Sequence, residues 1–540
     1  MQYQDLFKIK PITNYDVKDG RVAFIREEDI PRAYILGEGR IDSNFYAEEV
    51  SWINEKKLAV VGDPKGSEKR EIYIFEGSLS PILKDEYDNV NPWFITDDKF
   101  YFLSNRESNT IHLFLYEGGE INRLSEGNIP VDSFCVSEDG KKVAYSQGIY
   151  DQDLHILEVD KWREEIVSLS QSEEFPASSQ CFTRDGILFI SNKNNYFDIG
   201  IFNNGDIKWL KTSNHEKYEA LYFNDKLVYI EDNFGDFNII KDDKIIVSEG
   251  YNRNLYVDGN YLYYLGSNYD RFSDLYRVDK DGNIERLTNS MEGISGNFVR
   301  PKKVEYKSFD GVNIPSLLYS KGNETKGVVY IHGGPDWECV NTFSPTIQFL
   351  VDAGFKVICP NYRGSTGYGR KFNHLNDKDL GGGDLKDVIH AAKFLNLNKI
   401  AVTGASYGGY LTMMAVTKYP DIWCSAVAVV PFVNWFTERQ FEREFLQQYD
   451  EIKMGNDHNL LVDRSPIFFI DNIKTPLMIL AGEYDPRCPA EETEQVVKKL
   501  KEKGVEIEYK IYENEGHGFA KIENYVDSIR NTVEFIKKCK

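Results

Sequence analysis

A tight polar turn recurs about every forty residues through the first half of the chain. Between residues 12 and 290, short runs of β-branched and aromatic residues alternate with these turns, and helical spacing is almost absent. The turns lie at Asp19-Gly20, Asn54-Glu55, Asp97-Asp98, Asp139-Gly140, Asp185-Gly186, Asn224-Asp225 and Asp258-Gly259. Their period is typical of four-stranded propeller blades, whereas a β-sandwich would not impose so regular a spacing. The sequence therefore predicts a seven-bladed β-propeller.

The pattern changes beyond Arg300-Pro301, where apolar runs alternate with segments of helical spacing. The predicted strands cover residues 328–332, 356–359, 400–403, 426–430 and 477–481. Such alternation favours a mainly parallel, doubly wound sheet, as in an α/β-hydrolase domain. A chain of 540 residues also exceeds what one hydrophobic core usually organises. We therefore expect two domains, a propeller over residues 1–295 and an α/β domain over residues 296–540.

Net charge and composition limit which binding partners, cellular location and cofactors we expect for this chain. A net charge of −22 repels phosphate backbones and anionic lipids, so we expect neither nucleic acid nor a membrane as a partner. The first ten residues lack a basic start and an apolar run, which favours a cytoplasmic location. Seven scattered cysteines without a CxxC pair predict neither a disulfide framework nor a structural zinc. We expect no metal and no cofactor.

A nucleophile elbow follows the predicted strand at residues 400–403. The sequence Gly404-Ala405-Ser406-Tyr407-Gly408 fits the pattern G-x-S-x-G, and a segment of helical spacing comes directly after it. Glycine is needed on both flanks because the turn is too tight for side chains there. The strand and helix around the motif make Ser406 the predicted nucleophile.

Chain order selects the base and the acid. A serine hydroxyl needs a histidine to accept its proton and a carboxylate to orient that histidine, in the order Ser, Asp or Glu, His. Asp485 follows the strand at residues 477–481, and His517 is the only histidine beyond it. Glu483 is the rival acid, but Asp485 lies at the exposed end of the turn. We therefore predict a triad of Ser406, Asp485 and His517.

Two backbone N–H groups are the predicted oxyanion donors. One belongs to Tyr407, the residue after the nucleophile, and the other to Gly334 in the sequence His332-Gly333-Gly334-Pro335. The alternative for the glycine pair is a plain turn.

Six motifs together resemble the prolyl oligopeptidase family of serine peptidases, most closely its acylaminoacyl-peptidase branch. They are YIHGGP (330–335), NYRGSTGYGRKF (361–372), GASYGGYLTM (404–413), SPI (465–467), GEYDPRCP (482–489) and EGHGF (515–519). The resemblance implies that the propeller admits only short peptides and that the second domain cleaves them through an acyl-enzyme. It also implies the release of N-acylated amino acids or the cutting of oligopeptides.

The resemblance points to substrate-binding residues as well. Arg487, two residues after the predicted triad acid, occupies the place of an arginine that binds a substrate carbonyl in related enzymes, although a surface ion pair is the alternative. Phe432, Trp435 and Phe436 follow the strand at residues 426–430, where the pocket for the residue before the scissile bond is expected. Ordinary core packing would also explain such aromatic residues.

Several functions stay open at this point. Members of this family that cut after proline tend to have tyrosine at the position of His332, which favours the acylaminoacyl branch here. Dipeptidyl or prolyl-type oligopeptidase and carboxylesterase activities are the enzymatic alternatives. A propeller scaffold beside an inert hydrolase half is the alternative without catalysis. The expected partners are short peptide substrates, and assembly into a homo-oligomer stays open.

Overall fold

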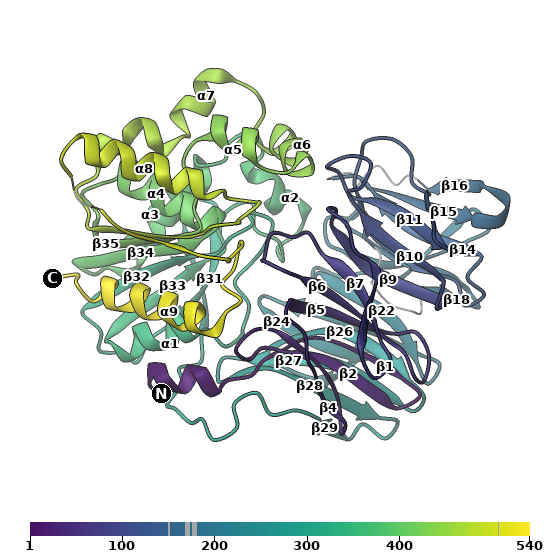
Figure 1. Ribbon diagram of the computed structural model, residues 1–540. Helices are drawn as coiled ribbons and strands as arrows, with labels where there is room; N and C mark the ends of the chain where they lie inside the picture. The colour runs from purple at the N-terminus through teal and green to yellow at the C-terminus, as the bar shows by residue number, and fades with distance from the viewer. Residues whose placement is uncertain (150–151, 168–172, 175–180, 506) are drawn as a thin grey trace. The chain divides into compact units, whose positions relative to one another are not determined.

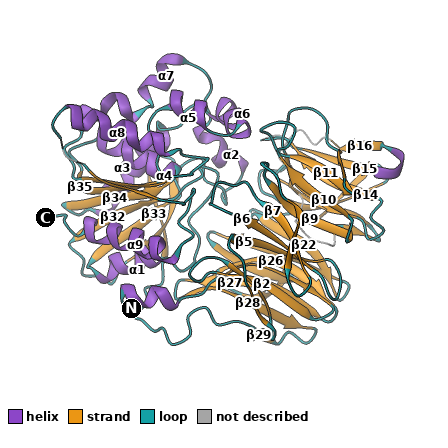
Figure 2. Cartoon of the chain, in the orientation of Figure 1, coloured by secondary structure: helices purple, strands orange, loops and turns teal. Residues whose placement is uncertain are grey.

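The computed structural model describes residues 1–149, 152–167, 173–174, 181–505 and 507–540. The chain forms two compact units. One contains Ile9–Pro64 and Glu68–Gly293, and the other contains Met1–Lys8, Lys65–Ser67 and Ile294–Lys540. The first unit is built almost entirely of strands, and most helices belong to the second (Figure 2).

The first unit is a seven-bladed β-propeller (Figure 1). Its blades are β1–β4 (Ile12–Lys18, Arg21–Arg26, Arg32–Ile35, Gly39–Ile41), β5–β8 (Tyr46–Trp52, Leu58–Asp63, Glu71–Phe75, Leu79–Leu83), β9–β12 (Asn89–Thr96, Lys99–Ser104, His112–Glu117, Glu120–Arg123), β13–β16 (Val131–Val136, Lys142–Gln147, Asp153–Glu158, Arg163–Val167), β17–β21 (Glu173–Glu174, Phe182–Thr183, Gly186–Ser191, Asp198–Asn203, Asp206–Lys211), β22–β25 (Lys217–Phe223, Lys226–Asn233, Asp236–Lys241, Lys244–Val247) and β26–β29 (Tyr251–Asp258, Tyr261–Asn268, Arg271–Asp279, Ile284–Arg286). The predicted number of blades is confirmed.

The predicted polar turns connect neighbouring strands within the blades. Asp19-Gly20 joins β1 to β2, and Asp258-Gly259 joins β26 to β27 in the same way. In the fifth blade, Asp185-Gly186 joins β18 to β19. The forty-residue period of the sequence is therefore the distance along the chain from one blade to the next.

Apolar layers between the blades hold the ring together. Phe100 and Phe114 of the third blade, for example, pack with Val61 and Ile72 of the second. The ring closes in the same manner, because Val17 and Phe24 of the first blade share a core cluster with residues of the seventh, including Leu265. The sixth and seventh blades are also joined by hydrogen bonds through the parallel pair β24–β26.

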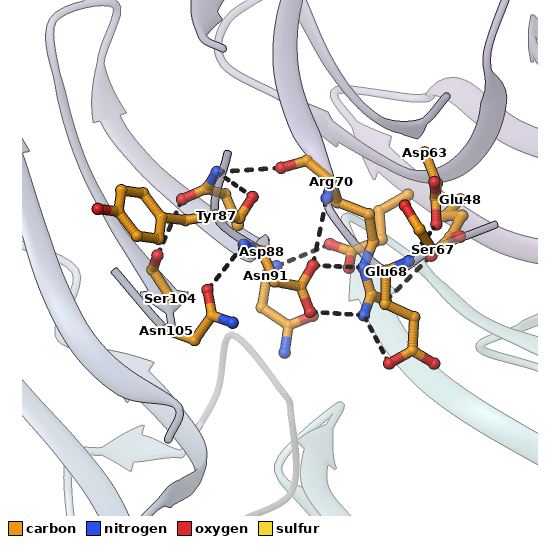
Figure 3. A network of polar contacts seen from close by, with 12 residues as sticks. Glu48, Asp63, Ser67, Glu68, Arg70, Tyr87, Asp88, Asn91, Ser104 and Asn105 are labelled. Carbon is orange, nitrogen blue, oxygen red and sulfur yellow. Dashed lines mark hydrogen bonds and ion pairs between the residues drawn. The ribbon is translucent and has the colours of Figure 1, made fainter. Parts of the chain in front are cut away.

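A polar network crosses the boundary between the second and third blades (Figure 3). Arg70, just before β7, donates from Nε and Nη2 to the two carboxylate oxygens of Asp88, at 2.7 and 2.8 Å. Its Nη1 donates to Glu48 on β5 at 3.0 Å. The Asp88 side chain is only 2% exposed, so the guanidinium neutralises a buried carboxylate. Burial raises the pKa of Glu48 to about 7.

We expect Arg70→Ala to destabilise the propeller strongly. Removing one partner of a buried ion pair leaves an uncompensated charge, which typically costs about 3 to 5 kcal/mol. Urea unfolding followed by intrinsic fluorescence measures this loss. Lys226→Ala is the control, because its pair with Asp242 is about half exposed on both sides and contributes little. Similar losses in the two variants would contradict a stabilising role for Arg70.

An eight-stranded sheet forms the centre of the second unit. Its strand order is β30-β31-β33-β32-β34-β35-β36-β37, with antiparallel pairing at β30–β31 and β31–β33 and parallel pairing elsewhere. The strands are Lys302–Lys307, Asn313–Tyr319, Lys326–Ile331, Phe355–Pro360, Lys399–Ala405, Trp423–Val429, Leu477–Gly482 and Glu508–Tyr512, numbered β30 to β37 along the chain. Each of the five predicted strands overlaps one of these, which confirms the mainly parallel sheet.

Helices cover both faces of this sheet (Figure 1). They are α1 (Pro345–Asp352), α2 (Arg370–Asn373), α3 (Gly383–Leu395), α4 (Tyr407–Lys418), α5 (Trp435–Phe441), α6 (Glu444–Lys453), α7 (His458–Asp463), α8 (Ala490–Glu502) and α9 (Ile522–Ile536). α1 and α9 lie on one face, and α3, α4 and α8 lie on the other. A short 3₁₀ helix, Tyr3–Lys8, belongs to the same unit, where the Tyr3 hydroxyl donates to Glu534 on α9 at 3.0 Å.

Four of the cysteines form disulfides, so the expectation of unpaired cysteines is wrong for them. Cys135 pairs with Cys181 in the propeller, and Cys424 on β35 pairs with Cys539 after α9. Separations of 46 and 115 residues conceal these pairs in the sequence. Because disulfides persist mainly in oxidising compartments, the pairs do not support the predicted cytoplasmic location. None of the helices in the described ranges is long and apolar enough to cross a membrane.

Thiol counting tests this pairing. Protein denatured without a reductant should expose the three free thiols of Cys339, Cys359 and Cys488 to a thiol reagent. Protein reduced before denaturation should expose all seven. Seven reactive thiols without reduction would show that the two pairs are not covalently bonded.

Candidate active site

Ser406 lies at a strained turn between β34 and α4. Its backbone has φ 59° and ψ −123°, a combination that a non-glycine residue adopts only when its surroundings impose it. The glycines of the motif are required by close packing: a Cβ on Gly404 would lie 2.6 Å from the carbonyl oxygen of Gly408, and one on Gly408 would lie 2.2 Å from that of Ile331. The turn holds the serine side chain at the carboxyl end of β34.

A chain of hydrogen bonds joins Ser406, His517 and Asp485. Nε2 of His517 lies 2.8 Å from Oγ of Ser406, and Nδ1 lies 2.7 Å from Oδ2 of Asp485. Asp485 follows β36, and His517 follows β37, so neighbouring parallel strands bring the three residues together. The structure thus places all three predicted triad residues within hydrogen-bond distance of their partners.

Backbone hydrogen bonds hold the Asp485 carboxylate in place, in addition to its contact with His517. Its Oδ1 accepts hydrogen bonds from the backbone N–H groups of Arg487 and Cys488, at 2.8 and 2.9 Å, and its side chain is fully buried. A carboxylate held in this way orients the imidazole so that Nδ1 carries the hydrogen and Nε2 can accept the serine proton. Such an arrangement can activate a serine hydroxyl for attack on a carbonyl carbon.

The two predicted oxyanion donors both line the cavity at Ser406. Tyr407 is the first residue of α4, so its N–H has no carbonyl of a preceding helical turn to bond. Gly334 has φ +121°, in the left-handed region that favours glycine. Its neighbour Gly333 packs so closely on the elbow that an added Cβ would lie 3.1 Å from the Ala405 carbonyl oxygen. Residues of two different loops, Gly334 and Tyr407, therefore border the cavity that contains Ser406.

Hydrogen bonds from buried polar side chains stabilise the two loops that contain Gly334 and Tyr407. The ring of His332 stacks on Tyr362 and hydrogen-bonds through Nδ1 to the Gly333 carbonyl at 2.6 Å. Burial lowers the pKa of His332 to about 4, so the ring is neutral and serves to hold the glycine loop. The hydroxyl of Tyr407 donates to Asp384 on α3, whose pKa burial raises to about 7. Sequence reasoning missed Asp384, because no motif marks it.

The cavity beside Ser406 has a volume of roughly 160 Å³ and contains most of the predicted substrate-binding residues. Phe432 and Trp435 line it, and Arg487 lines it with an exposed side chain. Phe436 does not belong to the described residues that line this cavity. It packs instead on His458 and Phe468, because the next residue along a helix points about 100° away.

Three acidic residues also line this cavity, and sequence reasoning missed them. They are Glu438, Glu442 and Asp450. A signal was present, because positions 435, 438 and 442 fall on one face of a helix and Trp435 was already a candidate.

A fluorophosphonate probe should label the wild-type chain at Ser406. Ser406→Ala should abolish labelling, because the probe reacts with an activated serine. Asp485→Asn should slow labelling by orders of magnitude, since the corresponding change in a serine protease lowers kcat by about 10⁴. Ser528→Ala, on α9, is the control and should label normally. Mass spectrometry of the labelled peptide checks the site, and labelling that persists in Ser406→Ala would contradict it.

The parallel sheet, the elbow and the hydrogen-bonded serine, histidine and aspartate define the second unit as an α/β-hydrolase domain. Residues 341–540 match the prolyl oligopeptidase family.

The chain is also similar in sequence to individual peptidases. The chain is 31% identical to dipeptidyl peptidase family member 6 of Caenorhabditis elegans over 229 residues, which is 40% of this chain and 31% of that protein. It is 28% identical to acylamino-acid-releasing enzyme 1 of rice, over 43% of this chain and 33% of that protein. The chain thus spans about a third of the length of these relatives.

A puromycin-hydrolyzing peptidase of Mycobacterium tuberculosis has a similar structure, with a TM-score of 0.87 at 18% identity. That match covers 100% of this chain and 96% of the other. At this identity the likeness concerns the fold, and it extends over both the propeller and the hydrolase domain.

Proposed function

We propose that this chain is a serine peptidase that hydrolyses short peptides through an acyl-enzyme intermediate. The observation that carries the proposal is the hydrogen-bonded chain of Ser406, His517 and Asp485 within the region that matches the prolyl oligopeptidase family. In this proposal Ser406 attacks the scissile carbonyl, His517 takes its proton and passes it to the leaving amine, and Asp485 orients the imidazole.

The oxyanion of the tetrahedral intermediate would be bound by the N–H groups of Tyr407 and Gly334. The position of Tyr407 at the start of α4 and the presence of both residues in the cavity with Ser406 support this role. Arg487 would bind a carbonyl oxygen of the substrate, and its place in the lining of the same cavity supports this. Phe432 and Trp435 would contact the side chain of the residue whose carbonyl is attacked.

The propeller has a role in this proposal as a size filter. We propose that the propeller, predicted over residues 1–295 and formed by Ile9–Pro64 and Glu68–Gly293, admits short peptides. The other unit, predicted over residues 296–540, would carry the catalysis. Among the products, N-acylated amino acids are favoured by the likeness to an acylamino-acid-releasing enzyme. The release of dipeptides is the second candidate, favoured by the likeness to a dipeptidyl peptidase family member.

Substrate comparison tests the proposed activity. An N-acetylated amino-acid anilide, a dipeptide anilide with a free amino terminus and a p-nitrophenyl ester are supplied to the wild-type chain and to Ser406→Ala. We expect hydrolysis of at least one anilide by the wild type and none by the variant, because the amide bond needs the activated serine. Ester hydrolysis without any amide hydrolysis would identify a carboxylesterase instead. Peptides of graded length, in the same assay, should be cleaved more slowly as length increases.

A further inference from the structure

A group of buried acidic residues, which we call the acidic pocket, lines the cavity beside Ser406: Glu438, Glu442 and Asp450. Glu438 lies on α5, Glu442 directly follows it, and Asp450 lies on α6. The three residues are 3%, 6% and 7% exposed. Oε2 of Glu438 and Oε1 of Glu442 are buried without a hydrogen-bond partner among the described residues. Two glutamates that line the cavity of the candidate nucleophile thus each have one buried and unpaired carboxyl oxygen among the described residues.

Glu492, a buried glutamate in the same region, has hydrogen-bond partners and serves as a comparison for the acidic pocket. Glu492 on α8 is fully buried, and its carboxylate accepts hydrogen bonds from the backbone N–H groups of Val433 and Asn434, at 2.8 and 2.9 Å, and from the Thr437 hydroxyl. Glu492 therefore has the partners that burial demands. A buried polar atom without such partners costs about 1 to 3 kcal/mol, and the acidic pocket contains two. This cost is explained if a ligand supplies the missing partner.

The three carboxyls of the acidic pocket resist ionisation as they stand, and a bound cation would relieve this resistance. Burial and the neighbouring carboxylates raise the pKa of Glu442 to about 10, and burial raises that of Asp450 to about 7. Burial, together with Glu492 and other acidic neighbours, raises the pKa of Glu438 well above its ordinary value. The guanidinium of Arg439 on α5 donates to Asn456 and to the carbonyls of Gly455 and Asp450.

Aromatic side chains line the same cavity as these carboxyls. Phe432 stacks on Tyr410 with ring centroids 4.3 Å apart, and Trp435 meets Phe432 edge to face at 4.8 Å. Both rings are buried, so they form a fixed surface. A cavity lined by both aromatic rings and carboxyls suits a group with an apolar stem and a positively charged tip.

We propose that the acidic pocket binds a positively charged group of the substrate, an ammonium or a guanidinium. This inference rests on the proposed peptidase function and specifies its substrate class. The cation has two sources with the same chemistry. One is the lysine or arginine side chain of the residue whose carbonyl Ser406 attacks, and the other is the free α-amino group of a short peptide. The cation would donate charge-assisted hydrogen bonds to the carboxyl groups of Glu438 and Glu442, which line the cavity.

Four fluorogenic amides separate these sources. Acetyl-arginine and acetyl-lysine amides carry a charged side chain, acetyl-norleucine amide has an uncharged side chain of similar length, and norleucine amide carries a free α-amine. If the side chain is bound, kcat/KM for the arginine or lysine amide should exceed that for acetyl-norleucine amide at least about tenfold, as expected for a charged hydrogen bond. If the α-amine is bound, norleucine amide should exceed its acetylated form similarly.

Isosteric variants connect this preference to the pocket. Glu438→Gln and Glu442→Gln should each lower kcat/KM for the preferred charged substrate about 10- to 100-fold and leave acetyl-norleucine amide nearly unchanged. Glu494→Gln, exposed on α8, is the matched control and should change neither. Equal losses on charged and uncharged substrates would overturn the proposal, and so would hydrolysis by the wild type without any charge preference.

A binding measurement keeps the inference independent of turnover. Calorimetry with Ser406→Ala should detect n-butylguanidinium, and Glu438→Gln in the same background should weaken its binding about tenfold or more. n-Pentanol, uncharged and of similar size, should bind no better than weakly to either protein. Absence of all amide hydrolysis by the wild type would reject the peptidase function, whereas absence of butylguanidinium binding would reject the acidic pocket as a cation site.

Discussion

The backbone of Ser406 is the constraint on which the active-site arrangement depends. A serine with positive φ is unstable in isolation, so the surrounding residues must hold it there. Hydrogen bonding does so in part, since the Ser406 N–H donates to the Val429 carbonyl on the neighbouring strand at 2.9 Å. Packing does the rest, because Gly404 and Gly408 approach backbone oxygens too closely for any side chain. The rigid parallel sheet thus maintains a local strain that exposes one hydroxyl.

The same sheet explains why residues distant in sequence meet at this hydroxyl. Parallel strands end at one edge, and the loops after β32, β34, β36 and β37 deliver the glycine pair, the serine, the aspartate and the histidine. The loop after β35 and the helices α5 and α6 add the aromatic wall and the acidic pocket. Position within the sheet therefore fixes the catalytic groups, while the inserted helices between β35 and β36 determine what can fit beside them.

Features that follow from local pattern could be predicted from the sequence, and features that follow from long-range packing could not. The propeller could be predicted because a polar turn recurs in the sequence once in each blade. The nucleophile elbow could be predicted because its tight turn requires glycines at a fixed spacing from the serine. The pairing of Cys424 with Cys539 was invisible, since only the packing of α9 against the sheet brings them together. The acidic pocket was missed for a related reason. Helical spacing places Glu438 on the same face as Trp435, but charged residues on a helix are normally solvated, and only the packing of the folded chain shows that Glu438 is buried.

The unit that carries the active site is discontinuous along the chain. Its 3₁₀ helix at Tyr3–Lys8 contacts α9 through the hydrogen bond between Tyr3 and Glu534, which are 531 residues apart, and almost the whole propeller lies between them in the sequence. During synthesis on a ribosome, the first residues must therefore wait for nearly the entire chain, while the propeller can assemble as soon as its last blade emerges. The order of biosynthesis thus favours a folded propeller before the unit that carries the candidate active site can be completed.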